Sequence, residues 1–273
     1  MNAVQVGPLV FANGRFIAII AIMAFLLASE LFARWRKSDA RAIHRWALAT
    51  LLGWIVGARL GFVALNLDAF VAAPLDAFAV WQGGFHLRAG ALTAAAVLLI
   101  AFLRSSPSAL PVALSALVAS AAAGLTDLAL PNGLDGRIPD ITLADMTGTQ
   151  VSLSNDSGEP VVLNLWATWC PPCRREMPMM MEIAAAQDNT KIIFANQGED
   201  PATIAQFLAI ANLPQDGILR DPQNALMQEF GMIGLPSTLF FAADGQLVTT
   251  HTGEISRASL LRKIADISPN PQE

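Results

Sequence analysis

Four long apolar stretches in the first half of the 273-residue chain constrain its fold more than any other feature. They run over roughly residues 9–33, 46–65, 89–103 and 109–130. A helix needs about 20 apolar residues to cross a bilayer, so each stretch is a candidate span, although the third is short and needs residues of the preceding loop. We therefore expect residues 1–130 to form an all-α transmembrane domain of four helices.

Basic residues after the first apolar stretch set the expected orientation. They are Arg34, Arg36, Lys37, Arg41 and Arg45. Cytoplasmic loops carry such an excess of Lys and Arg, so this loop is expected inside, and Arg104 in the turn after the third stretch agrees. No basic residue precedes Arg15, which is unlike a cleavable signal peptide. We expect a multi-pass protein of the bacterial inner (cytoplasmic) membrane, with its N-terminus and its second half on the periplasmic side.

The second half differs from the first in charge and pattern. Residues 1–131 carry nine Lys/Arg and five Asp/Glu, a net charge of +4, whereas residues 132–273 carry eight and seventeen, a net charge of −9. The second half alternates apolar and polar residues in the manner of a soluble domain. Residues 131–138 are rich in turn formers and are expected to be a linker, which leaves 139–273 as the second domain. We expect no nucleic-acid partner.

The only two cysteines of the chain lie in one motif, Trp169-Cys170-Pro171-Pro172-Cys173. The apolar run 161–166 before it predicts a strand, and the two prolines predict the start of a helix. A Cys-x-x-Cys motif at such a junction is typical of dithiol–disulfide exchange. The free N–H groups and the dipole at the helix start favour the thiolate of Cys170, which is the species that attacks a disulfide, so Cys173 is expected to resolve the mixed disulfide.

Two other interpretations of the cysteine pair stay open at this point. A zinc site needs about four ligands, and the histidines at 44, 86 and 251 show no ligand spacing around Cys170. The second is an inert structural disulfide, but a bridge that closes so small a loop restrains the unfolded chain little. We favour a redox-active cysteine pair, and we expect neither a metal nor a cofactor.

Hydrophobic periodicity predicts alternating strands and helices in the second half. Strands are expected within 141–153 and over 161–167, 191–196, 238–242 and 246–251, and helices over 170–187, 201–211, 223–230 and 257–267. The Asp244-Gly245 pair predicts a hairpin between the last two strands. This order indicates one α/β sheet with helices on its faces.

Three segments resemble the TlpA/ResA-type membrane-anchored thioredoxin-like proteins. Residues 163–178, which contain both cysteines, are similar to the active-site signature of that family. Residues 138–153 resemble the hairpin that precedes its core, and residues 231–238 resemble its loop with a cis-proline. The resemblance covers roughly residues 138–268. It implies an α/β thioredoxin-like fold and a thiol–disulfide oxidoreductase, typically a reductant that a membrane thiol donor keeps reduced.

The resemblance also implies roles for individual residues. Cys170, Cys173 and Glu176 are expected to be catalytic, and Trp169, Leu235 and Pro236 are expected to bind the substrate. Pro236 is expected in cis, with the backbone of Leu235 pairing with the bound substrate. The two arginines of the signature, Arg174 and Arg175, are expected to form a solvated face.

The acidic residues near the cysteines each have two interpretations. Glu176 stands where the family places an acid near the thiols, and a partly buried carboxylate there could take the proton of Cys173. The alternative is a solvated glutamate that only favours the helix dipole. Thioredoxin has a buried Asp at the position of Asn164, so that proton acceptor is missing here. Glu199 aligns with an acid near the active site of some relatives, or it merely begins a helix.

The first half resembles a second family. Residues 6–9, 57–63 and 74–84 are similar to parts of the first third of prolipoprotein diacylglyceryl transferase, over about residues 4–103. Arg88 stands where a catalytic-type His is expected, and the family's later arginine-bearing signature has no counterpart. We therefore expect no transfer of diacylglyceryl groups by this half.

Arg59 lies within the second apolar stretch, where a charge is costly in lipid. It is expected to face the interior of the helix bundle, a partner or the headgroups. A structural arginine and a binding site for a phospholipid headgroup are the two interpretations that stay open.

Together these features predict a membrane-anchored, extracytoplasmic thiol–disulfide oxidoreductase that reduces client disulfides. Its expected partners are disulfide-bearing proteins, membrane lipid and a separate membrane thiol donor of the DsbD or CcdA kind, because no span contains a cysteine. One alternative is a client-specific thiol reductant in cytochrome c or copper-site assembly. Another is a non-catalytic membrane scaffold that keeps the thioredoxin fold.

Overall fold

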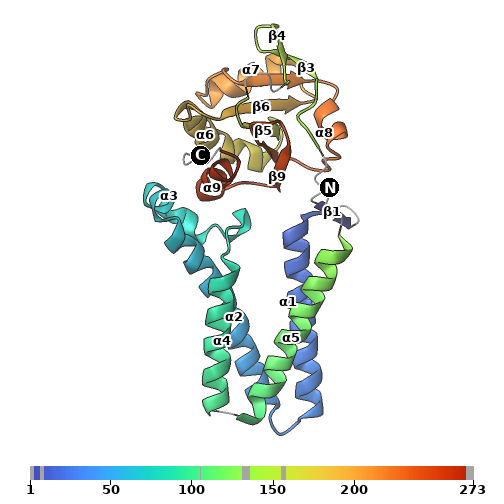
Figure 1. Cartoon of the computed structure of the whole chain (residues 1–273), viewed down its shortest axis with the longest axis vertical. Coiled ribbons are helices and arrows are strands. Elements are labelled where there is room, and N and C mark those ends of the chain that lie inside the picture. Colours follow the sequence, from blue (N-terminus) through green and yellow to red (C-terminus); the bar gives the residue numbers. More distant parts are fainter. Residues whose placement is uncertain (1–2, 7–8, 105, 131–135, 155–157, 269–273) are drawn as a thin grey trace. The chain divides into compact units, whose positions relative to one another are not determined.

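The computed structural model describes residues 3–6, 9–104, 106–130, 136–154 and 158–268 (Figure 1). The chain divides into two compact units. One is Asn13–Pro131, and the other joins Met1–Ala12 to Asn132–Glu273. Each unit contains buried hydrophobic clusters of its own.

Four helices of the first unit are long and apolar enough to cross a membrane, which confirms the four expected spans. They are α1 (Asn13–Trp35), α2 (Ala40–Leu65), α4 (Leu87–Arg104) and α5 (Ser106–Ala129). Figure 1 shows α1 alongside α5 and α2 alongside α4, and these two pairs make the most extensive contacts among the helices.

The first span begins later than the apolar pattern predicts. Residues Leu9–Ala12 are not helical but form strand β2, which pairs with strand β1 (Ala3–Val6) in an antiparallel hairpin. An apolar run by itself does not distinguish a strand from a helix, so hydropathy alone placed the start of the span at residue 9 instead of Asn13.

Arg59 of α2 is buried and binds the segment that connects α2 to α4. That segment folds as α3 (Leu67–Ala72) and the 3-10 helices η1 (Pro74–Phe78) and η2 (Val80–Gln82). The guanidinium donates to the carbonyl oxygens of Asp76, Ala77, Gly83 and Gly84 at 2.5 to 2.9 Å. These bonds support the structural interpretation of Arg59, because its N–H groups hold the main chain of the connecting segment.

Glycines spaced four residues apart let α2 and α4 pack closely. Gly53, Gly57 and Gly61 lie on α2, and a Cβ added at Gly57 would lie 2.0 Å from Oγ1 of Thr93 on α4. The Thr93 hydroxyl also lies 2.9 Å from the carbonyl oxygen of Gly53, across the interface. Small residues at this spacing let membrane helices approach each other closely. The spacing is a packing signal that hydropathy does not reveal.

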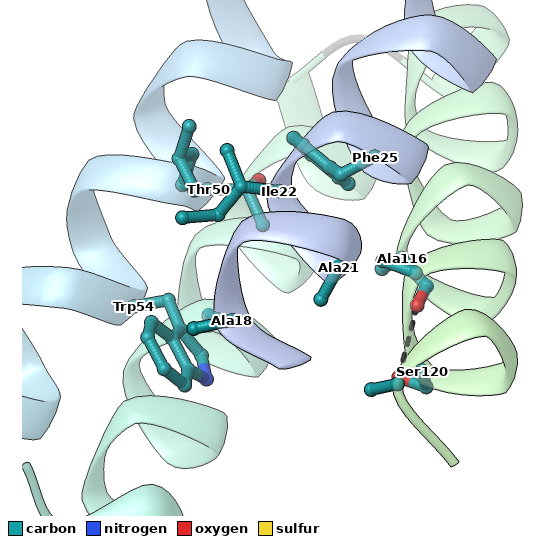
Figure 2. A pocket seen from close by; sticks show the side chains of 12 residues that line it. Ala18, Ala21, Ile22, Phe25, Thr50, Trp54, Ala116 and Ser120 are labelled. Carbon is teal, nitrogen blue, oxygen red and sulfur yellow. Dashed lines mark hydrogen bonds between the residues drawn. The ribbon is translucent and has the colours of Figure 1, made fainter. Parts of the chain in front are cut away.

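Small side chains leave a pocket of about 230 Å³ among α1, α2, α4 and α5 (Figure 2). Alanines make up much of its lining, together with Phe25 and Trp54. The hydroxyl of Ser120 donates to the carbonyl of Ala116, as the dashed line in Figure 2 marks, and Thr50 donates to a carbonyl one turn earlier on α2. Because both hydroxyls bond within their own helices, the pocket presents a largely apolar lining.

Seven strands of the second unit form one sheet with the order β4-β3-β7-β6-β5-β8-β9. They are β3 (Thr142–Asp145), β4 (Gln150–Ser152), β5 (Val161–Trp166), β6 (Lys191–Gln197), β7 (Ile218–Asp221), β8 (Ser237–Phe241) and β9 (Leu247–Thr252). Strands β5, β6 and β7 are parallel, and the other pairs are antiparallel. The central strands and their order give the expected α/β thioredoxin-like fold.

Helices cover both faces of this sheet. They are α6 (Pro171–Ala185), α7 (Pro201–Ile210), α8 (Ala225–Glu229) and α9 (Arg257–Ile267). Helices α6, α7 and α9 pack with Val162 and Trp166 of β5 on one face. Helix α8 packs with Leu163 and Leu165 of the same strand on the other face, as the alternation of side chains along a strand requires.

The sequence pattern does not predict strand β7. Its four residues contain only two apolar side chains, at Ile218 and Leu219, which is too short a run to show a period. Its conformation comes from pairing on both sides, with β6 through Ala195 and with β3 through Ala144. The predicted hairpin at Asp244-Gly245 is confirmed, because β8 and β9 pair on either side of it and Gly245 has φ +81°.

The expected linker lies only partly within the described residues. Residues 131–135 lie outside them. The next three residues bond to the β8–β9 hairpin, with Ile138 N donating to Gly245 O at 2.9 Å and Leu247 N donating to Gly136 O at 2.8 Å. Arg137 adds a bond to the carbonyl of Asp244. The chain is therefore fixed to the edge of the sheet from Gly136 onward.

The contact between α2 and α4 can be tested by adding a side chain at Gly57. Gly57→Leu should lower the unfolding free energy by about 1–3 kcal/mol, because the new side chain overlaps Thr93 and forces the helices apart. Gly124→Leu on α5 is the matched control, since a Cβ there meets nothing within 4 Å. Thermal unfolding of the full chain in detergent measures both variants. Equal midpoints for the two would contradict the proposed packing.

Candidate active site

The cysteine motif lies where strand β5 ends and helix α6 begins. Cys170 is the N-cap of α6, with Pro171 and Pro172 at the first helical positions. These prolines fit because the first helical N–H groups have no partner within the helix. The Cys170 sulfur accepts a hydrogen bond from the N–H of Cys173 at 3.3 Å. A cysteine sulfur thus occupies the position at which a helix N-terminus stabilises negative charge.

Cys170 and Cys173 form a disulfide with a Cα–Cα distance of 5.3 Å. Cys170 is 2% exposed and Cys173 is fully buried, whereas the adjacent Trp169 is 67% exposed. Only the first cysteine therefore has any contact with solvent in this oxidised state. The indole of Trp169 provides an apolar surface next to it.

The Leu235–Pro236 peptide bond is cis, as the resemblance implies. Strand β8 begins directly after Pro236, and its Ser237 pairs with Leu165 at the end of β5. This register places the cis-proline loop at the end of the central strands where the cysteine motif also lies. Leu235 packs against the hydrophobic cluster that contains both cysteines.

Glu176 is buried one turn after Cys173 on α6. Its Oε1 accepts a hydrogen bond from Asn164 Nδ2 of β5, and its Oε2 accepts one from the N–H of Ile255, both at 2.9 Å. Asn164 also donates to Thr238 Oγ1 of β8 at 3.1 Å. The interpretation of Glu176 as a solvated residue is wrong, since the carboxyl lies between the helix and the sheet.

Burial is the main influence on this carboxyl group. It raises the pKa of Glu176 from 4.5 to about 8, against the lowering effect of the bonds from Ile255 and Asn164. The nearby Glu254 raises the same pKa further and Arg175 lowers it. At neutral pH the Glu176 side chain is therefore mostly protonated when the cysteines are oxidised. A carboxyl with a pKa close to that of a thiol is suited to exchange a proton with one.

Glu199 holds the loop that leads to Cys170. It follows β6, and its carboxylate accepts hydrogen bonds from both the N–H and the hydroxyl of Thr168, at 2.7 and 2.5 Å. Asn196 of β6 donates to the same carboxylate at 2.7 Å. Of the two interpretations of Glu199, the structure supports a place beside the cysteine motif.

The two arginines of the motif are both exposed, as expected, and each also contacts another part of the unit. Arg175 pairs with Glu254 through two N–H groups. The Arg174 guanidinium lies 5.6 Å from the ring centroid of Phe207 on α7. The sequence does not predict these two contacts, because the partners of both arginines come from distant parts of the chain. No local pattern marks them.

Comparisons with known proteins agree with this geometry. The Redoxin family profile matches residues 134–264. The thiol-disulfide oxidoreductase ResA of Geobacillus thermodenitrificans is 30% identical over 133 residues, which cover 48% of this chain and 76% of the relative. The chain belongs to the ResA family of thiol-disulfide oxidoreductases.

Other relatives of this ResA-family chain are similar over the same half. The thiol:disulfide interchange protein HelX of Rhodobacter capsulatus is 28% identical over 139 residues, covering 50% of this chain and 78% of HelX. The crystal structure of StoA from Bacillus subtilis matches with 24% identity and a TM-score of 0.41, covering 46% of this chain and 99% of StoA.

The membrane half of this ResA-family chain matches a separate family. The prolipoprotein diacylglyceryl transferase profile matches residues 2–126. The match therefore extends beyond the expected 4–103 and includes most of α5. Family membership makes the protein a thiol-disulfide oxidoreductase that acts on disulfide-bearing proteins, and its four apolar helices anchor it in a membrane.

The raised pKa of Glu176 predicts a pH-dependent contribution to stability. The folded state binds a proton up to about pH 8 and the unfolded state only up to about 4.5, so stability from this group is lost as pH rises through that window. Glu176→Gln removes this dependence. As the pH rises from about 4.5 to about 8, the natural protein should lose stability and the variant should not. The unfolding free energy of the variant should therefore exceed that of the natural protein by on the order of a few kcal/mol at the upper end of this range.

Denaturant unfolding of the oxidised full chain in detergent at several pH values measures this difference. Glu229→Gln on α8 is the control, because Glu229 is an exposed carboxyl on a different helix. Parallel curves for Glu176→Gln and the natural protein would show that Glu176 is ionised in the folded state.

Proposed function

We propose that the chain is an extracytoplasmic reductase of client disulfides, held in the bacterial inner membrane by residues 1–130. Residues 131–138, the last three of which bond to the β8–β9 hairpin, join this domain to a catalytic domain over 139–273. The observation that carries the proposal is the buried Glu176 carboxyl, one helical turn from Cys173 and beside the Cys170–Cys173 pair at the start of α6. Such a site supplies both the nucleophile and a proton acceptor that disulfide reduction needs.

The reduced enzyme begins the reaction. The Cys170 thiolate attacks one sulfur of the client disulfide, forms a mixed disulfide, and releases the other client sulfur as a thiolate that takes a proton from solvent. The thiolate is favoured by the N–H of Cys173 and by the dipole of α6. Trp169, Leu235 and Pro236 hold the client chain beside Cys170, with the backbone of Leu235 as its pairing edge.

Cys173 completes the reaction. In those reduced molecules in which the Glu176 carboxyl is ionised, the Cys173 thiol passes its proton to it, and the resulting thiolate attacks the sulfur of Cys170. The Cys170–Cys173 disulfide forms and the second client sulfur leaves as a thiolate, so two electrons pass from the enzyme to the client. The product has a protonated Glu176 beside a disulfide, which is the state that the pKa of about 8 favours at neutral pH.

The enzyme must then be reduced again by a second protein. We propose a membrane thiol donor of the DsbD or CcdA kind, because both cysteines of the chain lie in the catalytic motif and none lies in a membrane helix. The donor reverses the steps above, and Glu176 returns its proton to Cys173. An extracytoplasmic compartment forms disulfides readily, so a tethered reductant is useful where a specific pair must be reopened.

Trapping of mixed disulfides tests this proposal. Cys173→Ser should accumulate adducts with client proteins, because Cys170 still attacks and no residue resolves the bond. Non-reducing electrophoresis of membranes followed by mass spectrometry identifies the clients, and narrow clients in cytochrome c or copper-site assembly would appear here. The variant that carries both Cys170→Ser and Cys173→Ser is the control. Equal adducts in both variants, or a natural protein that is fully oxidised in cells, would refute the proposed reductase.

Membrane topology gives a second test. The basic residues at 34–45 predict an N-terminus and a C-terminus outside the cytoplasm. Alkaline phosphatase fused after Glu273 should be active, and the same enzyme fused after Ser38 should be inactive. A cytoplasmic reporter such as β-galactosidase should give the opposite pattern. Active phosphatase at Ser38 alone would place the catalytic domain in the cytoplasm.

A further inference from the structure

Three consecutive residues after β9 bond to both halves of the candidate active site. The N–H of Gly253 donates to the carbonyl of Pro236 at 2.8 Å. The carboxylate of Glu254 pairs with Arg175 of α6, with Nε at 2.9 Å. The N–H of Ile255 donates to Glu176 Oε2 at 2.9 Å. We call residues 253–255 the bridging segment, since it joins the cis-proline loop to the cysteine helix.

The Arg175–Glu254 pair is more than an exposed ion pair. The Glu254 side chain is 8% exposed, and Nε and Nη2 of Arg175 both donate to its Oε2. Exposed pairs contribute little, but a pair with one buried member is sensitive to the loss of its partner. The carbonyl of Glu254 also lies 3.1 Å from Nε2 of His251, which further fixes the segment.

We infer that Arg175 and Glu254 are positioning residues of the exchange reaction, which hold the Ile255 N–H on Glu176 and balance the charge beside it. The pair thereby controls how readily Glu176 takes and returns the proton of Cys173. The inference rests on the proposed role of Glu176 as the proton acceptor. Arg175 and Glu254 are not assigned contacts with the reacting sulfurs and act through Glu176.

The charged groups around Glu176 make the two members of the pair distinguishable. Helix α6 contributes Arg175 and the two cysteines, the bridging segment contributes Glu254, and β9 contributes His251 through the Glu254 carbonyl. Two basic residues of α9 have partners of their own. On α9, Arg257 pairs with Glu182, and Lys263 donates to Thr249.

Removal of each member should therefore have opposite effects. Arg175→Gln leaves the negative charge of Glu254 uncompensated, so Glu176 should keep its proton to higher pH. Glu254→Gln leaves the positive charge of Arg175, so Glu176 should lose its proton at lower pH. Each midpoint should move by on the order of one pH unit. A purely structural pair predicts changes in the same direction, because either variant breaks the same contact.

The experiment is an infrared titration of the oxidised full chain in lipid nanodiscs. The carbonyl band of protonated Glu176 is assigned as the band that Glu176→Gln removes, and its midpoint is measured for each variant. Arg174→Gln is the matched control, since Arg174 is the neighbour of Arg175 but lies over Phe207. Arg175→Lys and Glu254→Asp keep the charges and should restore midpoints close to that of the natural protein.

The pH dependence of mixed-disulfide resolution gives an independent readout. Stopped-flow resolution of the adduct between Cys170 and a model thiol should shift along the pH axis in the same sense as each infrared midpoint. The inference would be overturned if the infrared midpoints of Arg175→Gln and Glu254→Gln moved in the same direction or did not move. The charge-conserving variants Arg175→Lys and Glu254→Asp show whether a shift comes from charge and not from misfolding. If Glu176→Gln resolves the adduct at the normal rate, the proposed proton role fails, while the titration still reports whether the pair acts on Glu176.

Discussion

The buried carboxyl of Glu176 connects helix α6 to strand β5 and to the segment after β9. Its two oxygens accept hydrogen bonds from β5 through Asn164 and from the segment after β9 through Ile255. A buried carboxyl without these partners would cost several kcal/mol, so the fold must bring both donors to it. Asn164 suits this arrangement because its amide donates to Oε1 without adding charge, whereas an ionised acid at the same position would place two negative carboxylates against each other.

The two units of the chain reach close packing by different means. The catalytic unit buries large side chains such as Trp166, Phe194 and Met177 between a sheet and helices, where the hydrophobic effect stabilises them. The membrane unit cannot gain in this way from lipid, so α2 and α4 approach through glycines, and a hydroxyl of Thr93 bonds across the contact. The absence of water within lipid also explains the bonds of Arg59. Its guanidinium donates to main-chain carbonyl oxygens because no water is present there to accept these hydrogen bonds.

The parts of the fold that local signals encode could be predicted from the sequence. Apolar length predicts the four spans, the prolines after Cys170 predict the start of α6, and Asp244-Gly245 predicts the last hairpin. Strand β7 and the hairpin of β1 and β2 could not be predicted, because their short runs take strand conformation from pairing with neighbours. In the site, the family signature indicates the cysteines and Pro236. The bonds of Glu254 to Arg175 and of Ile255 to Glu176 join residues 79 positions apart, and nothing local marks them.

The proton balance at Glu176 does not by itself set the direction of electron flow. Glu176 in the oxidised enzyme has a pKa of about 8, and an ordinary thiol has one of about 8.5. Proton transfer between Glu176 and Cys173 is therefore nearly balanced and favours neither oxidation nor reduction. Stabilisation of the Cys170 thiolate by the helix N-terminus favours the reduced enzyme, which by itself makes the disulfide a better oxidant. The proposed net reduction of clients therefore requires that the proposed membrane thiol donor reduces the pair faster than the surroundings oxidise it. The membrane helices of the chain would keep the catalytic unit in reach of a donor in the same membrane.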